Sequence, residues 1–112
     1  MQRRDTIAIK KIIDEMKIGI QLLGDKSLSS FVDDELSKRA ICMTTITIGE
    51  LVKVISDETR LTNKQFPWKA VAGMRDIAAH RYQTLRMEDV FNTVKYEYPD
   101  LINQLEKILT NE

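Results

Sequence analysis

Residues 41–48 read Ile-Cys-Met-Thr-Thr-Ile-Thr-Ile, and the fold class of the chain depends on whether they form a strand or a helix. Six of these eight side chains are β-branched, and the run from Thr45 to Ile48 alternates polar and apolar as a strand does. A stripe from Leu36 to Val54, however, recurs in steps of three and four residues without a change of phase. A lone strand would also lack a pairing partner elsewhere in the chain. The sequence therefore predicts one helix from Asp34 to about Ser56.

The segment before this helix has the same period. Its apolar residues from Ile9 to Leu23 form one amphipathic stripe. Asp5 or Thr6 can cap the start of such a helix, and Gly24 can end it. The sequence therefore predicts a first long helix that ends at Gly24.

Two stretches lack helical spacing. Residues 27–30 predict a loop followed by a short turn at Phe31 and Val32, and residues 62–66 predict another turn. Pro67 then suits the first position of a helix, where its missing N–H costs nothing, and this helix is expected to run from Trp68 to about His80.

A last helical pattern starts near Met87, after a connection at residues 83–84, and Pro99 is expected to kink or restart it. Composition agrees with helices, because only four Gly and two Pro occur in 112 residues and a β-sandwich needs many tight turns. The prediction is an all-α fold: one domain over residues 1–112, built as an antiparallel bundle of four to five helices.

Composition also excludes several classes of protein. Apolar residues make up 43% of the chain and charged residues 30%, as in a globular domain. The longest apolar run, Ala70 to Met74 with Gly73 counted, is far shorter than the ~20 residues of a membrane span. No signal-peptide stretch follows Arg3 and Arg4. Cys42 is alone, which excludes a CxxC motif and fits a reducing, cytoplasmic setting.

The charges balance over the chain but not along it. Seventeen basic and seventeen acidic residues give a net charge of zero. Residues 64–86 nevertheless carry five basic groups against Asp76 alone, and residues 87–112 carry two basic and six acidic groups. The basic segment fits an anion site or an acidic partner, and it equally fits a solvated helix face neutralised by the C-terminal helix.

The stretch from Ala72 to Tyr82 holds the most chemistry. It contains Arg75, the only histidine of the chain at position 80, and a tyrosine two residues later. On an ideal helix Arg75 and His80 lie ~7.5 Å apart along the axis and ~140° apart around it. One His without Cys or carboxylate at ligand spacing is a poor metal ligand set, so no metal site and no cofactor are expected.

Arginine and histidine without a metal suit RNA cleavage by attack of a 2′-hydroxyl on the adjacent phosphorus. Histidine carries protons near neutral pH, and arginine grips phosphate oxygens through two parallel hydrogen bonds. One His80 is half of this machinery, so a nuclease of this kind would have to be a two-fold dimer. The plainer interpretation is a partly buried histidine, an Arg75 paired with Asp76 or with a carboxylate of another helix, and a packing tyrosine.

At these residues the sequence resembles the HEPN superfamily, and more narrowly the HepT-like toxins of HepT/MntA toxin/antitoxin pairs. Arg75, His80 and Tyr82 match the family motif of Arg, four residues, His, one residue, Tyr. Order and spacing agree over roughly residues 6–110, and the further matching stretches are Ile48-Gly49-Glu50, Pro67-Trp68-Lys69-Ala70, Ala72-Gly73-Met74, Asp89 to Val94 and Tyr98-Pro99-Asp100-Leu101.

The resemblance implies a metal-independent ribonuclease that works as a homodimer with Arg75 and His80 as the catalytic pair. Asp76 and Glu50 are expected to support the pair, with Glu50 buried on a core helix and orienting Arg75. Tyr82 matches the tyrosine that an MntA-like minimal nucleotidyltransferase antitoxin modifies with AMP, which silences the toxin.

Arg81 and Lys69 add positive charge that would help to hold RNA. Arg81 and residues 83–85 depart from the commonest family pattern, which bears on substrate preference and on the fit to the partner. The alternatives are a non-catalytic binding module that partners a nucleotidyltransferase, and an all-α scaffold without a site.

Overall fold

The computed structural model describes residues 1–80 and 86–111, and for residues 77, 79 and 80 it describes the backbone alone. Four long helices dominate this part of the chain, namely α1 (Arg3–Leu23), α3 (Glu35–Lys53), α5 (Trp68–His80) and α7 (Tyr98–Thr110). Three short helices accompany them, namely α2 (Leu28–Asp33), α4 (Asp57–Thr62) and α6 (Met87–Asn92). The prediction of an all-α fold is confirmed.

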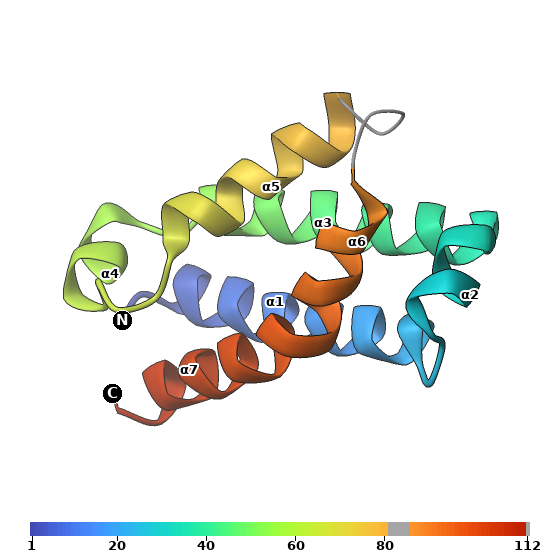
Figure 1. The fold of residues 1–112 in the computed structure, drawn as a ribbon. Helices are drawn as coiled ribbons and strands as arrows, with labels where there is room; N and C mark the ends of the chain where they lie inside the picture. The colour runs from blue at the N-terminus through green and yellow to red at the C-terminus, as the bar shows by residue number, and fades with distance from the viewer. Residues whose placement is uncertain (81–85, 112) are drawn as a thin grey trace.

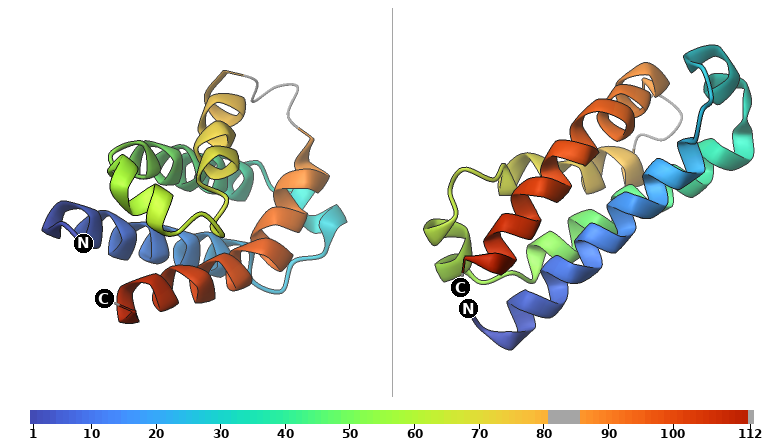
Figure 2. Two further views of the ribbon diagram at one scale, coloured as in Figure 1. Left: turned by 90° about the vertical axis from the view of Figure 1, so that its left-hand side faces the viewer. Right: turned by 90° about the horizontal axis from the view of Figure 1, so that it is seen from below.

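The long helices are stacked in the order α5, α3, α1, α7, and neighbouring helices run in opposite directions (Figure 1). The two chain termini lie at the same end of the stack in the turned views (Figure 2). α3 is the central element, because it packs against α1 on one side and against α5 on the other. Whatever α5 carries is therefore positioned mainly by α3.

The β-branched centre of α3 is helical, as predicted. The threonine hydroxyls bond back to carbonyls of the preceding turn, with Thr44 and Thr45 donating to Ile41 O at 2.8 and 3.0 Å. Thr47 donates in the same way to Met43 O at 3.0 Å. These bonds satisfy polar side chains inside a helix, so the strand propensity of the segment does not prevail.

The buried face of α3 differs from the predicted stripe. Leu36 and Met43 belong to that stripe but are 80% and 61% exposed. The buried positions lie on the other side of the helix and include Ile41, Ile48 and Val52. The helix was predicted correctly, but the face that enters the core was not.

The predicted loop at residues 27–30 is wrong. Ser27 is an N-cap whose hydroxyl accepts a hydrogen bond from the Ser30 N–H at 3.1 Å, and α2 follows it directly. Phe31 on α2 is fully buried, with its ring centroid 6.0 Å from that of Phe91. A capping serine and one buried aromatic side chain are enough to make this connection helical.

The predicted helix from Asp34 to Ser56 is also divided. α3 ends at Lys53, and Ser56 caps a further helix, α4, that the sequence did not predict. Asp5 lies within α1 instead of capping it, and its carboxylate accepts bonds from the Ser56 N–H, the Ser56 hydroxyl and the Thr59 hydroxyl at 3.0, 2.6 and 2.7 Å. Gly24 ends α1 as expected, with φ of 54°.

The two prolines mark helix starts. Pro67 lies one residue before α5 instead of at its first position, and its carbonyl accepts from the Val71 N–H at 3.0 Å. The backbone from α6 to α7 passes through a π-helical turn, η2 (Thr93–Glu97), in which the Tyr98 N–H donates to Thr93 O. Pro99 then stands in the first turn of α7 and has no N–H to continue the α-helical ladder, which agrees with the predicted restart.

None of the described helices is both long and apolar enough to cross a membrane.

Candidate functional site

Arg75 on α5 is fixed by two carboxylates. Its Nε donates to Glu50 Oε1 on α3 at 2.6 Å, and its Nη1 donates to Asp76 Oδ1 at 3.1 Å. The hydrogen bond to Glu50, followed by the one to Asp76, raises the pKa of Arg75 above its ordinary value. The guanidinium is thus held in one orientation and keeps its charge at any physiological pH.

Lys53 completes this network from α3. Its Nζ lies 3.6 Å from Asp76 Oδ1, the same oxygen that Arg75 contacts. The hydrogen bond from Arg75 and then the charge of Lys53 lower the pKa of Asp76. Two cations and two carboxylates therefore make a neutral cluster that ties α5 to α3, and we call these four residues, Glu50, Lys53, Arg75 and Asp76, the arginine network.

The sequence prediction for Glu50 was right about the contact and wrong about burial. Its side chain is 52% exposed, so it lies at the solvent-exposed edge of the α3–α5 contact instead of in the core. Lys53 was not predicted at all. Its spacing from Glu50, one helical turn later, was the signal that could have identified it.

Gly49 explains how α3 and α5 approach so closely at this point. A Cβ atom placed on Gly49 would overlap the Cβ of Arg75 and would lie 3.2 Å from the Ala72 carbonyl oxygen. The glycine therefore allows the backbones to come together, and the next residue, Glu50, then reaches Arg75.

Two further predicted site residues, Lys69 and His80, lie at opposite ends of α5. Lys69 is exposed in the first turn. His80 is the last residue of the helix, so an unbroken α5 puts its backbone about 7.5 Å beyond that of Arg75 along the axis. Arg81 and Tyr82, and the connection predicted at residues 83–84, lie outside the described residues.

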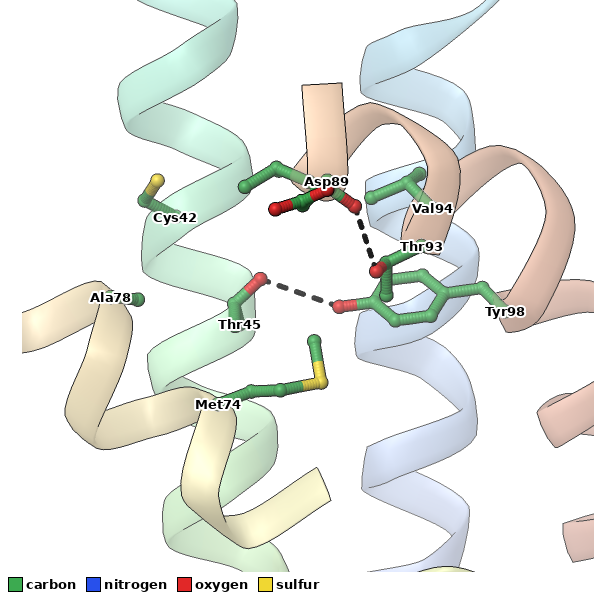
Figure 3. A pocket seen from close by; sticks show the side chains of 9 residues that line it. Cys42, Thr45, Met74, Ala78, Asp89, Thr93, Val94 and Tyr98 are labelled. Carbon is green, nitrogen blue, oxygen red and sulfur yellow. Dashed lines mark hydrogen bonds between the residues drawn. The ribbon is translucent and has the colours of Figure 1, made fainter. Parts of the chain in front are cut away.

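A cavity of about 190 Å³ lies on another face of α5, between α3 and the segment from α6 to α7 (Figure 3). Met74 and Ala78 of α5 line it, together with Thr45 and Tyr98. The Thr45 hydroxyl donates to Ile41 O, so the Tyr98 hydroxyl is the donor in the 3.3 Å bond between the two side chains. Burial raises the pKa of Tyr98, so the hydroxyl stays neutral. The residues that line the cavity include Asp89 but no Lys or Arg, so they offer no cation for a phosphate.

Among the residues that the structure describes, no group of three His, Cys, Asp or Glu side chains is arranged to hold a metal ion. The arginine network can instead hold one guanidinium in a defined direction next to the helix end that carries His80. Such a group binds an anion such as phosphate.

Comparison with known proteins agrees with the motif. The chain is 33% identical over 104 residues to "Putative RNase TTE0752" of Caldanaerobacter subterraneus subsp. tengcongensis, covering 93% of each chain. It is 33% identical over 110 residues to "Putative RNase MJ0125" of Methanocaldococcus jannaschii, covering 97% of this chain and 95% of the relative. It is also 24% identical over 108 residues to "Probable ribonuclease HepT" of Thermococcus cleftensis, covering 96% of this chain and 98% of the relative.

No solved structure matches the chain at a significant level. The family model described as "Ribonuclease HepT-like" matches residues 9–108, a range that includes the whole arginine network, His80 and Tyr82. With this match and relatives one-third identical along nearly their whole length, the chain belongs to the HepT-like ribonuclease family.

Proposed function

We propose that this protein is a metal-independent endoribonuclease, that Arg75 and His80 carry out the reaction, and that it is the toxin of a toxin/antitoxin pair. The observation that carries the proposal is the arginine network, which holds Arg75 in one orientation on the helix that ends at His80. Family membership and the names of the relatives support the same activity.

The reaction is a transesterification within the RNA. A base takes the proton of a 2′-hydroxyl, the 2′-oxygen bonds to the adjacent phosphorus, and the bond to the 5′-oxygen breaks. An acid gives a proton to the leaving 5′-oxygen, and the products are a 2′,3′-cyclic phosphate and a free 5′-hydroxyl. Arg75 stabilises the charge that develops on the phosphate oxygens.

The proton transfers require two histidines, and each chain has one. A two-fold homodimer that joins the C-terminal ends of two α5 helices supplies His80 of the partner subunit as the second proton carrier. One imidazole acts as base and the other as acid, so activity requires the dimer.

Glu50 and Asp76 act as positioning residues in this scheme. They fix the guanidinium before substrate arrives, so the phosphate meets an ordered donor. Lys69 and Arg81 contribute positive charge for RNA.

Regulation follows from Tyr82, two residues after His80. We propose that an MntA-like minimal nucleotidyltransferase antitoxin transfers AMP from ATP to the Tyr82 hydroxyl and releases pyrophosphate. The added nucleotide is bulky and anionic, so it occupies the cleft and repels the substrate phosphates.

The test combines intact mass with an RNA cleavage assay in EDTA, on the chain expressed alone and together with its nucleotidyltransferase. Added mass of AMP size that is absent in Tyr82→Phe, and cleavage only by the unmodified protein, are the expected results. Arg75→Ala and His80→Ala should each abolish cleavage while the far-ultraviolet circular dichroism stays helical.

A non-catalytic module that pairs with a nucleotidyltransferase is the competing function. It is favoured if a folded dimer neither cleaves RNA nor gains mass. Expression of a toxin alone is expected to arrest the growth of the host cells. The competing function is also favoured if His80→Ala and Arg75→Ala each leave that growth arrest unchanged.

A further inference from the structure

An open groove of about 610 Å³ lies where α4 leads into α5, at the end of α5 opposite to His80. Its walls are apolar, formed by Phe66, Pro67 and Trp68, and its charged members are Arg60, Lys64 and Lys69. No acidic side chain lines it. We call this surface the cationic groove.

Carboxylates of the described residues do not neutralise the three cations of the groove. In the described ranges, none of Arg60, Lys64 and Lys69 forms an ion pair with a carboxylate. Arg60 donates from Nη2 to the Val52 carbonyl oxygen at 2.7 Å, and its buried Nε has no hydrogen-bond partner. The groove therefore carries three positive charges on a chain whose net charge is zero.

The arginine network contrasts with this surface. Lys53 and Arg75 are balanced there by Glu50 and Asp76, so the network attracts a polyanion only weakly. It can orient one phosphate, but it cannot gather a long RNA from solution. A ribonuclease built on this network needs a separate surface that supplies the electrostatic attraction.

The groove is suited to the RNA backbone and not to bases. Trp68 is only 6% exposed, its Nε1–H donates to Asn63 O at 3.0 Å, and its ring centroid lies 4.4 Å from that of Phe66. Both aromatic rings are thus committed to the core and offer no stacking platform. Lys64 and Lys69 are exposed and can follow phosphates without reading sequence.

Lys69 connects the groove to the site along α5. Residues 69, 73, 76 and 80 recur at steps of four, three and four, so their Cα atoms lie on one side of the helix. His80 follows Lys69 by eleven positions, which is about 16 Å along the axis. A strand held in the groove can therefore run along α5 to the helix end that carries His80.

We propose that the cationic groove is a sequence-independent docking surface for single-stranded RNA, which holds the substrate several nucleotides away from the bond that is cleaved. The choice of RNA as the ligand rests on the proposed ribonuclease function, and the location of the binding surface rests on the residues of the groove. It assigns RNA contacts to Arg60 and Lys64 in addition to Lys69.

The experiment measures binding instead of cleavage. The full-length His80→Ala variant is titrated with a fluorescent 12-nucleotide single-stranded RNA at several salt concentrations, alone and combined with Lys64→Gln/Lys69→Gln. Losing two phosphate contacts should lower the slope of log Kd against log salt by about 1.4. Between 50 and 200 mM salt, the parent should therefore weaken by about sevenfold more than the groove variant.

The matched control is Lys10→Gln/Lys11→Gln, which removes the same charge from two exposed positions on α1 outside the groove. The control should retain the slope of the parent. Equal slopes for the groove and control variants would overturn the proposal. So would a groove variant that loses affinity for an acidic polypeptide such as polyglutamate but not for RNA.

The two proposals can fail separately. If the wild-type chain cleaves RNA while the groove variant binds and cleaves as the control does, the groove proposal alone is overturned. If the wild-type chain cleaves nothing while RNA binding still depends on Lys64 and Lys69, the groove proposal stands and the ribonuclease proposal falls.

Discussion

Gly49 of α3 and Arg75 of α5 meet so closely that a Cβ on the glycine would overlap the Cβ of the arginine. The same Cβ would lie 3.2 Å from the Ala72 carbonyl oxygen, so the α5 backbone also leaves no room for it. The Arg75 Cβ and the Ala72 carbonyl oxygen are not flexible ends of side chains, so neither atom can move away unless α5 moves. The position of Arg75 therefore depends on a residue that has no side chain.

Gly49→Ala is expected to push α5 away from α3 and to separate Arg75 from Glu50. The overpacked contact should cost about 1–3 kcal/mol in the free energy of unfolding. Urea denaturation followed by circular dichroism measures that loss. The RNA cleavage activity of the molecules that remain folded should also fall. A variant with wild-type stability and activity would show that α5 can shift at no cost.

The outcome for α3 shows which part of the fold the sequence could predict. Local propensity favoured a strand at residues 41–48, while the three- and four-residue steps favoured a helix, and the helix formed because the threonine hydroxyls bond back to Ile41 and Met43. The steps through Leu36 and Met43 nevertheless marked the wrong face. Threonine counts as polar in a sequence, yet Thr44 and Thr45 are buried on the core face beside Ile41.

The site was predictable only in part, for a related reason. Arg75, Asp76 and Glu50 were predicted together, and the structure brings these three side chains into contact. The exposure of Glu50, the contribution of Lys53 and the role of Gly49 depend on where α3 crosses α5. That crossing is set by packing between residues more than 20 positions apart, which no local pattern reports.

Glu50 is expected to act on the reaction through Arg75. Glu50→Ala leaves the guanidinium without its partner on α3, and kcat/KM for RNA cleavage should fall by about 10- to 100-fold because Arg75 is no longer oriented. Steady-state kinetics with the wild type as reference measures this loss.

Glu50→Gln is the control, because its amide oxygen can still accept the hydrogen bond from Arg75 Nε. It should recover most of the activity, whereas a purely charge-based role would leave it as impaired as Glu50→Ala. Equal activity of the wild type and Glu50→Ala would remove Glu50 from the mechanism.

Asp5 is expected to make folding stability depend on pH. Burial alone would raise the pKa of Asp5, but the bonds from Ser56 and Thr59 and the charge of Arg4 outweigh it, so the pKa is lowered in the folded protein. The stabilisation is complete above the ordinary carboxyl pKa of about 3.9 and is lost as the pH falls through the lowered folded pKa.

Asp5→Asn should therefore lower the free energy of unfolding by about 1–3 kcal/mol at neutral pH. The difference from the wild type should shrink as the pH falls from about 4 through the lowered pKa of folded Asp5, because this carboxyl is protonated first in the unfolded chain and then in the folded one. Denaturation curves at several pH values measure this. Asp14→Asn, at an exposed position of the same helix, should be without effect, and a difference that stays constant down to pH 2 would contradict the account.

Gly73 presents the opposite case to Gly49 on the same pair of helices. A Cβ at Gly73 would meet nothing within 4 Å, so no residue in the described part of the chain requires a glycine there. Glycine in the interior of a helix is less favourable than alanine by about 0.5–1 kcal/mol. Gly73→Ala should therefore raise the free energy of unfolding of the isolated chain by about that amount, while Gly49→Ala lowers it.

Gly73→Ala also tests the proposed path of the RNA along α5. Gly73 is on the side of α5 that joins Lys69 to the backbone of His80, the side on which RNA is proposed to lie. If RNA passes close to the helix there, Gly73→Ala should weaken binding of the 12-nucleotide RNA while it stabilises the protein. A stabilised variant with unchanged RNA affinity would place the strand farther from the helix axis, and a destabilised one would contradict this account of Gly73.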